Sequence, residues 1–202
     1  MVTVRRVGEA GLLLEAADPA ALYRRLLAER ATGALGEVAE IVPAARTVLL
    51  DGVADPGRVA RLVAAWTVTA AALADGPLVE LPVVYDGADL AEVAGHWGVS
   101  VARAVELHSG IEYRVAFCGF LPGFGYLTGL PEQLHVPRRA TPRPAVPAGS
   151  VAVAGPYTGV YPRSSPGGWQ LLGRTPAVLW DADRDPAALL APGTRVRFVE
   201  VA

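Results

Sequence analysis

Short apolar runs and helical apolar spacing alternate along the first part of the chain. The runs that predict strands are residues 2–7, 12–15, 38–42 and 47–50. A helix is predicted after each pair of strands, starting at Asp18-Pro19 and at Asp55-Pro56. Aspartate caps free backbone amides there, and proline fits the first helical position. The order ββαββα, with both helices on one face of an antiparallel sheet, is a ferredoxin-like α+β arrangement.

Beyond Gly76-Pro77 the pattern changes, so we place the domain boundary there and assign residues 1–77 and 78–202 to two domains. Strands of the second domain are predicted at 78–85, 111–117, 151–154, 170–172, 178–180 and 195–199. Many short strands joined by glycine and proline turns are typical of a closed barrel or a sandwich.

Two short predicted helices, 89–97 and 100–108, have the spacing of a helix-turn-helix. A helix that binds DNA carries several basic residues, and Arg103 is the single basic residue in the second helix apart from the terminal histidine. We therefore expect these helices to pack beside the barrel.

Charge and composition narrow the function further. The net charge is −2, which argues against a nucleic-acid partner or an anionic membrane surface. No apolar run is long enough to span a bilayer and none looks like a signal peptide, so a cytoplasmic protein is expected. All 18 basic residues are arginine, which excludes a Schiff-base lysine and the lysine of a phosphate-binding loop.

The segment from Phe120 to Arg174 concentrates unusual chemistry. Ten of the 17 prolines lie between Pro122 and Pro176, and no acidic residue occurs from 133 to 180. Aromatic residues are interleaved with the glycines, so a disordered linker is not expected. Arginine binds carboxylate or phosphate with a planar two-pronged fork, and an anion site is therefore predicted. Its preferred members are Arg138, Arg143 and Arg174, with pairing to distant acids such as Glu106 or Glu112 as the alternative.

Two further groups of residues are candidates for catalysis or binding. His108 and Glu112 are spaced so that both could enter one pocket as a general acid/base pair. No metal site is predicted, because no three-ligand pattern forms. The turn Ser164 to Trp169 offers backbone donors that could orient a carbonyl or an anion. Trp169 and Gln170 would line the pocket, with core packing as the alternative for Trp169.

Several long motifs carry a family resemblance. They are HSGIEYR at 108–114, GFLPGFGYL at 119–127, PRRATPR at 137–143, VPAGSV at 146–151, TGVYP at 158–162 and SPGGWQLLGRTP at 165–176. They resemble the family named allophanate hydrolase subunit 1, which includes the B subunit of bacterial 5-oxoprolinase and an inhibitor of a sporulation histidine kinase. The resemblance implies a ferredoxin-like N-terminal domain and a cyclophilin-like β-barrel.

It also implies a non-autonomous subunit of an ATP-dependent amidohydrolase. With the 5-oxoprolinase C subunit (an allophanate hydrolase subunit 2 type protein) and a third subunit, such an assembly opens 5-oxo-L-proline to L-glutamate. ATP is used by the assembled complex, and no cofactor is expected on this chain alone. The substrate would be a small amide or lactam with a carboxylate, held by Arg138, Arg143 or Arg174, while His108 and Glu112 assist proton transfer. The remaining substrate-binding candidates are Phe124, Ser165, Gly167, Gly168, Trp169 and Gln170.

Two other functions are consistent with the resemblance. One is inhibition of a histidine kinase by the barrel domain, and the other is a subunit of a urea carboxylase or allophanate hydrolase-type complex. The Ser-Ser-Lys chemistry expected for allophanate cleavage cannot be built from a chain without lysine.

Overall fold

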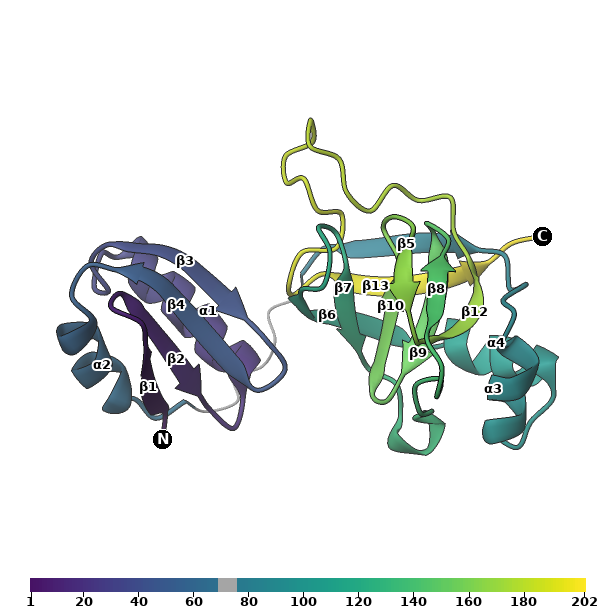
Figure 1. The fold of residues 1–202 in the computed structure, drawn as a ribbon, viewed down its shortest axis with the longest axis horizontal. Coiled ribbons are helices and arrows are strands. Elements are labelled where there is room, and N and C mark those ends of the chain that lie inside the picture. Colours follow the sequence, from purple (N-terminus) through teal and green to yellow (C-terminus); the bar gives the residue numbers. More distant parts are fainter. Residues whose placement is uncertain (69–75) are drawn as a thin grey trace. The chain divides into compact units, whose positions relative to one another are not determined.

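A computed structural model describes residues 1–68 and 76–202. Contacts between the residues define two compact units, one within Met1–Ala74 and one within Asp75–Ala202 (Figure 1). No helix in these described ranges is long and apolar enough to cross a membrane.

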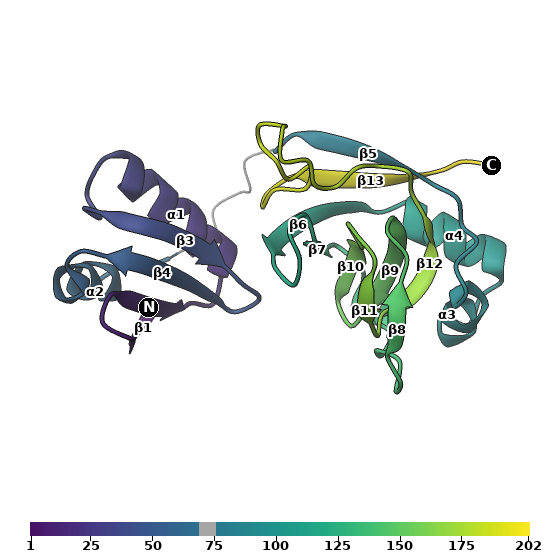
Figure 2. The ribbon, with the colours of Figure 1, turned by 45° about the horizontal axis from the view of Figure 1, so that its top comes forward.

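The first unit is a four-stranded antiparallel sheet whose two helices pack on one face (Figure 2). Its elements are β1 (Thr3–Val7), β2 (Gly11–Glu15), α1 (Pro19–Ala31), β3 (Val38–Pro43), β4 (Thr47–Val53) and α2 (Pro56–Ala64). The sheet order is β1-β2-β4-β3, and the predicted sequence of elements, ββαββα, is confirmed. Asp18 and Asp55 cap the two helices as predicted, because each side chain accepts a backbone N–H three residues ahead at 2.9 Å.

The second unit is a nearly closed barrel of seven strands in the order β12-β9-β10-β7-β6-β13-β5. Its larger strands are β5 (Leu78–Val83), β6 (Glu112–Cys118), β9 (Ser150–Ala154), β12 (Gln170–Arg174) and β13 (Arg195–Glu200). Short strands β7 (Gly125–Thr128) and β10 (Tyr157–Val160) complete it, and β8 (Arg143–Val146) pairs with β11 (Ser165–Gly167) in a separate ribbon. The predicted strand at 178–180 is wrong, because the single pairing there is an isolated bridge from Trp180 to Ala188.

Backbone hydrogen bonds between Val84 and Arg174 join the two ends of the seven-stranded sheet. Each residue donates its N–H to the other's carbonyl at 2.9 Å. The approach requires a glycine at position 173, since a Cβ there would lie 2.3 Å from the Val84 carbonyl oxygen. Barrel closure therefore depends on one position without a side chain.

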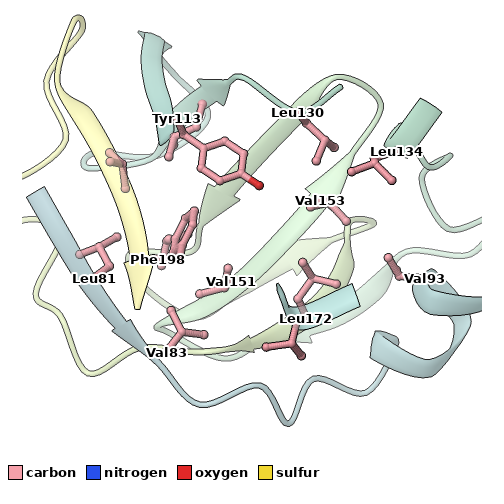
Figure 3. Packing of buried hydrophobic residues seen from close by; sticks show 14 of the residues in the cluster. Leu81, Val83, Val93, Tyr113, Leu130, Leu134, Val151, Val153, Leu172 and Phe198 are labelled. Atoms are coloured by element: carbon pink, nitrogen blue, oxygen red, sulfur yellow. The ribbon is translucent and has the colours of Figure 1, made fainter. Parts of the chain in front are cut away.

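The interior of the barrel is filled by large apolar side chains from opposite strands. Figure 3 shows Tyr113 and Phe198 meeting aliphatic residues such as Val151 and Leu172. Helices α3 (Leu90–His96) and α4 (Val101–Ser109) pack against β12 and β13, as expected for helices beside a barrel.

His108, at the end of α4, belongs to this interior. Its side chain is completely buried, and its ring centroid lies 5.3 Å from that of Tyr113 and 4.8 Å from that of Phe198. Its Nδ1 is 2.7 Å from the Tyr85 hydroxyl. Burial lowers the pKa of His108 to about 3, so the ring is neutral in the folded protein.

We expect Gly173→Ala to lower the free energy of unfolding by about 3 kcal/mol, the upper end of the range for overpacked sites. The new methyl group would meet the Val84 carbonyl at the barrel closure. Gly95→Ala in α3 is the matched control, because no atom lies within 4 Å of its added Cβ. Urea denaturation measures both, and equal midpoints for the two variants would contradict the role of Gly173.

The buried His108 should make stability depend on pH. The unfolded chain binds a proton at this ring below about pH 6.5, whereas the folded chain does so only near pH 3. Stability is therefore fully present above about pH 6.5 and is lost as the pH falls, by up to about 1.4 kcal/mol per pH unit from this group.

Urea titrations between pH 7 and pH 4.5 measure this slope. It should be shallower in His108→Phe than in wild type, although the variant also loses the contact with Tyr85. His96→Gln is the control, since His96 is exposed on α3. A slope unchanged in His108→Phe would show that the histidine titrates normally.

Candidate functional site

An open cavity of about 480 Å³ lies on the second unit, against the outer face of the barrel sheet. Its position follows from the alternation of side chains along the strands. On β9, Val151 and Val153 point into the barrel core, whereas Ala152 and Ala154 belong to a second apolar cluster. This second cluster also contains Phe124, Tyr161 and Trp169, with Tyr126 and Tyr157 packed against it. The cavity is therefore built on a small outer core.

Aromatic rings form most of the cavity wall. The Trp169 ring centroid is 5.3 Å from that of Phe124 and 5.6 Å from that of Tyr126, both at steep interplanar angles. Phe124 also meets Tyr161 edge to face at 5.4 Å. Such arrangements are the favoured ones for aromatic pairs, so each ring fixes the orientation of its neighbours. Phe120 and Tyr157 complete the aromatic lining.

The turn that begins at Ser165 approaches Tyr161 closely. A Cβ on Gly167 would lie 2.3 Å from the Tyr161 hydroxyl oxygen, so this contact requires glycine. Burial raises the pKa of Tyr161, against the opposing effects of the Trp169 backbone N–H and the charge of Arg138. The hydroxyl is therefore a neutral phenol at the cavity wall.

Arg138 is the cationic residue of the cavity. It lies on the exposed segment after Val136, and its charge acts on both Tyr126 and Tyr161. Within the ranges that the structure describes, no carboxylate lies at ion-pair distance from Arg138. Its guanidinium is available to an anionic ligand.

The other two arginines of the predicted anion site are paired with carboxylates. Arg143 Nη2 and Arg139 Nη1 each lie 2.7 Å from Asp89 Oδ1. Arg174 Nε lies 2.8 Å from Asp86 Oδ2 at the exposed surface. Pairing with distant acids was the open alternative, and the acids are Asp86 and Asp89 rather than Glu106 or Glu112.

Asp89 is almost fully buried at the start of α3. Its Oδ2 accepts the backbone N–H of Leu171 at 2.7 Å. Burial alone would raise the pKa of Asp89, but the hydrogen bonds from Arg143 and Leu171 and the charges of Arg143 and Arg139 outweigh it and lower the pKa. The carboxylate therefore stays ionised and links three parts of the chain.

The structure does not bring His108 and Glu112 into one pocket. His108 is enclosed in the barrel core, and Glu112 accepts hydrogen bonds from Arg195 at 3.4 Å and Arg197 at 3.3 Å. Neither residue lines the cavity. The expected convergence was wrong because both residues take their partners from distant parts of the chain, just after β5 and along β13.

The turn and its surroundings divide into residues at the cavity and residues behind it. Gly167, Trp169, Phe124 and Arg138 line the cavity, and a Cβ on Gly168 would lie 3.7 Å from Arg138 Nε. Ser165 and Gln170 are buried and do not line it. No group of three potential metal ligands occurs in the described ranges.

Four cavity residues were not selected from the sequence: Phe120, Tyr126, Tyr157 and Tyr161. The signal that could have found them is the interleaving of aromatic residues with glycine in the proline-rich segment. That pattern predicted order, but their common face depends on strand pairing between β7, β9 and β10.

Known proteins resemble this chain over almost its whole length. The 5-oxoprolinase B subunit of Escherichia coli O157:H7 is 47% identical over 207 residues, covering 96% of this chain and 93% of that protein. The crystal structure of TTHA0988 matches with a TM-score of 0.79 and 37% identity over 99% of this chain, which spans 40% of that longer protein. Kluyveromyces lactis urea carboxylase shares the fold, with a TM-score of 0.75 at 18% identity over all of this chain and 22% of its own.

The fold of these neighbours agrees with the expected cyclophilin-like barrel. The family model "Carboxyltransferase domain, subdomain C and D" matches residues 2–190. The chain therefore belongs to this carboxyltransferase-domain family, the one named allophanate hydrolase subunit 1, in which the 5-oxoprolinase B subunit is found.

Proposed function

We propose that this chain is the B subunit of an ATP-dependent 5-oxoprolinase and that its aromatic cavity binds 5-oxo-L-proline. The observation that carries the proposal is Arg138, which has no carboxylate partner in the described ranges and stands at the wall of an aromatic cavity. The 47% identity to a 5-oxoprolinase B subunit supports it. The assembly would open the lactam to L-glutamate together with the C subunit and a third subunit.

The chemistry of the cavity suits such a ligand. 5-Oxoproline carries one carboxylate on a five-membered lactam ring with apolar methylene groups. Arg138 would bind the carboxylate through two parallel N–H donors, which is the preferred geometry for this pair. Trp169 and Phe124 would contact the ring faces, and the Tyr161 hydroxyl would be the donor nearest to the lactam oxygen.

This chain would bind and orient the lactam but would not perform the whole reaction. It contains no lysine for a phosphate-binding loop, and its fully buried histidine, His108, is not among the residues that line the cavity. ATP would therefore be bound and used elsewhere in the assembly. We assign this chain the role of a substrate-binding subunit.

Substitution of Arg138 by glutamine should raise the KM of the reconstituted complex for 5-oxoproline. A hydrogen bond to a charged group contributes about 1.5–3 kcal/mol, which corresponds to roughly 10- to 150-fold. The kcat should change less than the KM, because Arg138 would hold the carboxylate equally in the ground state and the transition state. Glutamate formation at varied 5-oxoproline concentration measures both constants.

The matched control is Arg163→Gln, assayed on complex whose assembly has been checked by gel filtration. Arg163 is also exposed and has no carboxylate partner in the described ranges, but it does not line the aromatic cavity. Equal KM values for Arg138→Gln and wild type would remove Arg138 from the binding site. Absence of glutamate formation by the complete wild-type assembly would overturn the proposed function itself.

A further inference from the structure

A second, smaller hollow of about 250 Å³ lies next to the aromatic cavity. It is lined by Pro122, Pro162, Arg163 and Trp180. The turn from Gly119 to Phe124 separates the two, because Phe120 lines the cavity whereas Pro122 lines the hollow. We call Phe120, Pro122, Pro162, Arg163 and Trp180 the rim patch.

The rim patch exposes large apolar side chains that the fold could have buried. Phe120 is 57% exposed and Trp180 is 45% exposed. Two prolines lie between them, so the apolar surface is continuous around the hollow. A gathered apolar surface of this kind is typical of a protein interaction site, whereas single exposed apolar residues are not.

The backbone presents these side chains in a fixed way. Phe120 has a φ of +68°, a left-handed conformation that is costly for a bulky residue. The turn holds it there through hydrogen bonds from the Gly119 N–H to the Phe124 carbonyl at 3.2 Å and from the Phe124 N–H to the Leu121 carbonyl at 2.9 Å. The strain is consistent with an aromatic ring held for a partner rather than for the interior of this chain.

Arg163 supplies the polar centre of the patch. It is exposed beside Trp180, and no carboxylate in the described part of the chain is at ion-pair distance. Arginine and tryptophan are among the residues most enriched at the positions that dominate binding energy in protein interfaces. The fitting partner surface is therefore apolar and carries a carboxylate.

The relatives indicate which partner this is. The chain spans 40% of TTHA0988 and 22% of Kluyveromyces lactis urea carboxylase, so in those proteins a similar domain is part of a longer polypeptide. Here the additional chain would be a separate subunit. We propose that the rim patch docks the C subunit of the 5-oxoprolinase assembly and that docking covers the mouth of the aromatic cavity. This inference rests on the proposed function.

Two single variants test the patch, with the C subunit from the same organism as the probe. Arg163→Glu reverses the charge at an exposed position, and Trp180→Ser removes the largest apolar contact. Each should weaken binding of the C subunit at least about tenfold in a calorimetric or surface-binding titration. Val101→Ser is the matched control, because Val101 is 44% exposed on α4 and lies outside the patch. Far-ultraviolet circular dichroism confirms that the variants are folded.

The outcomes separate this inference from the proposed function. Wild-type binding that neither Arg163→Glu nor Trp180→Ser weakens would overturn the docking site while leaving the 5-oxoprolinase role intact. Wild-type chain that does not bind the C subunit would overturn the docking inference, and glutamate formation by the three mixed subunits would then decide the function separately. Arg138→Gln, designed to affect the ligand, should leave binding of the C subunit unchanged.

Discussion

The buried carboxylate of Asp89 is the interaction on which the cavity depends. It binds Arg139, Arg143 and the amide of Leu171, and so ties the segment after Val136 to β12 and to the start of α3. The Arg139 N–H also bonds the Gly168 carbonyl at 2.8 Å. Arg138 therefore stands beside an anchored neighbour. A buried ion pair is weak evidence for stability, because desolvation offsets attraction. Its clearer effect here is positional, since it occupies Arg139 and Arg143 and leaves Arg138 available to a ligand.

The strands of the barrel serve two cores at once. Inward side chains of β7, β9, β10 and β12 fill the barrel, and the outward ones support the aromatic wall. A binding surface on the outer face does not interrupt the packing that stabilises the fold. The cost is local crowding, and it appears where backbone and side chains meet most closely. Gly173 admits the closing strand, and Gly167 admits the ring of Tyr161. Both glycines belong to the same proline-rich segment, which explains why that segment combines rigid turns with aromatic residues.

The sequence predicted local features well and long-range partners poorly. Asp18 and Asp55 cap helices through residues three positions away, so the signal is contained in the sequence itself. The short strands β8, β10 and β11 have three or four residues each and no such signal, because distant pairing defines them. The same limit applies to the candidate site. Asp89 meets arginines 50 and 54 positions later, and Glu112 meets Arg195 83 positions later. Helical spacing could relate His108 to Glu112, but it could not reveal that Phe198 lies against the histidine ring.

Coverage of the cavity would change the strength of the interaction that defines it. Arg138 lies on an exposed segment, where solvent screens its attraction to a carboxylate. Two unit charges 4 Å apart attract by about 1 kcal/mol in bulk water and by about 4 kcal/mol at the effective dielectric typical of a protein surface. A subunit seated on the turn from Gly119 to Phe124 would exclude water from the cavity and move Arg138 toward the second case. Assembly and substrate binding would then be thermodynamically coupled, because each would favour the other by the same free energy. A chain whose cavity is open would bind its ligand weakly by itself, as suits a subunit whose reaction needs ATP used elsewhere in the assembly.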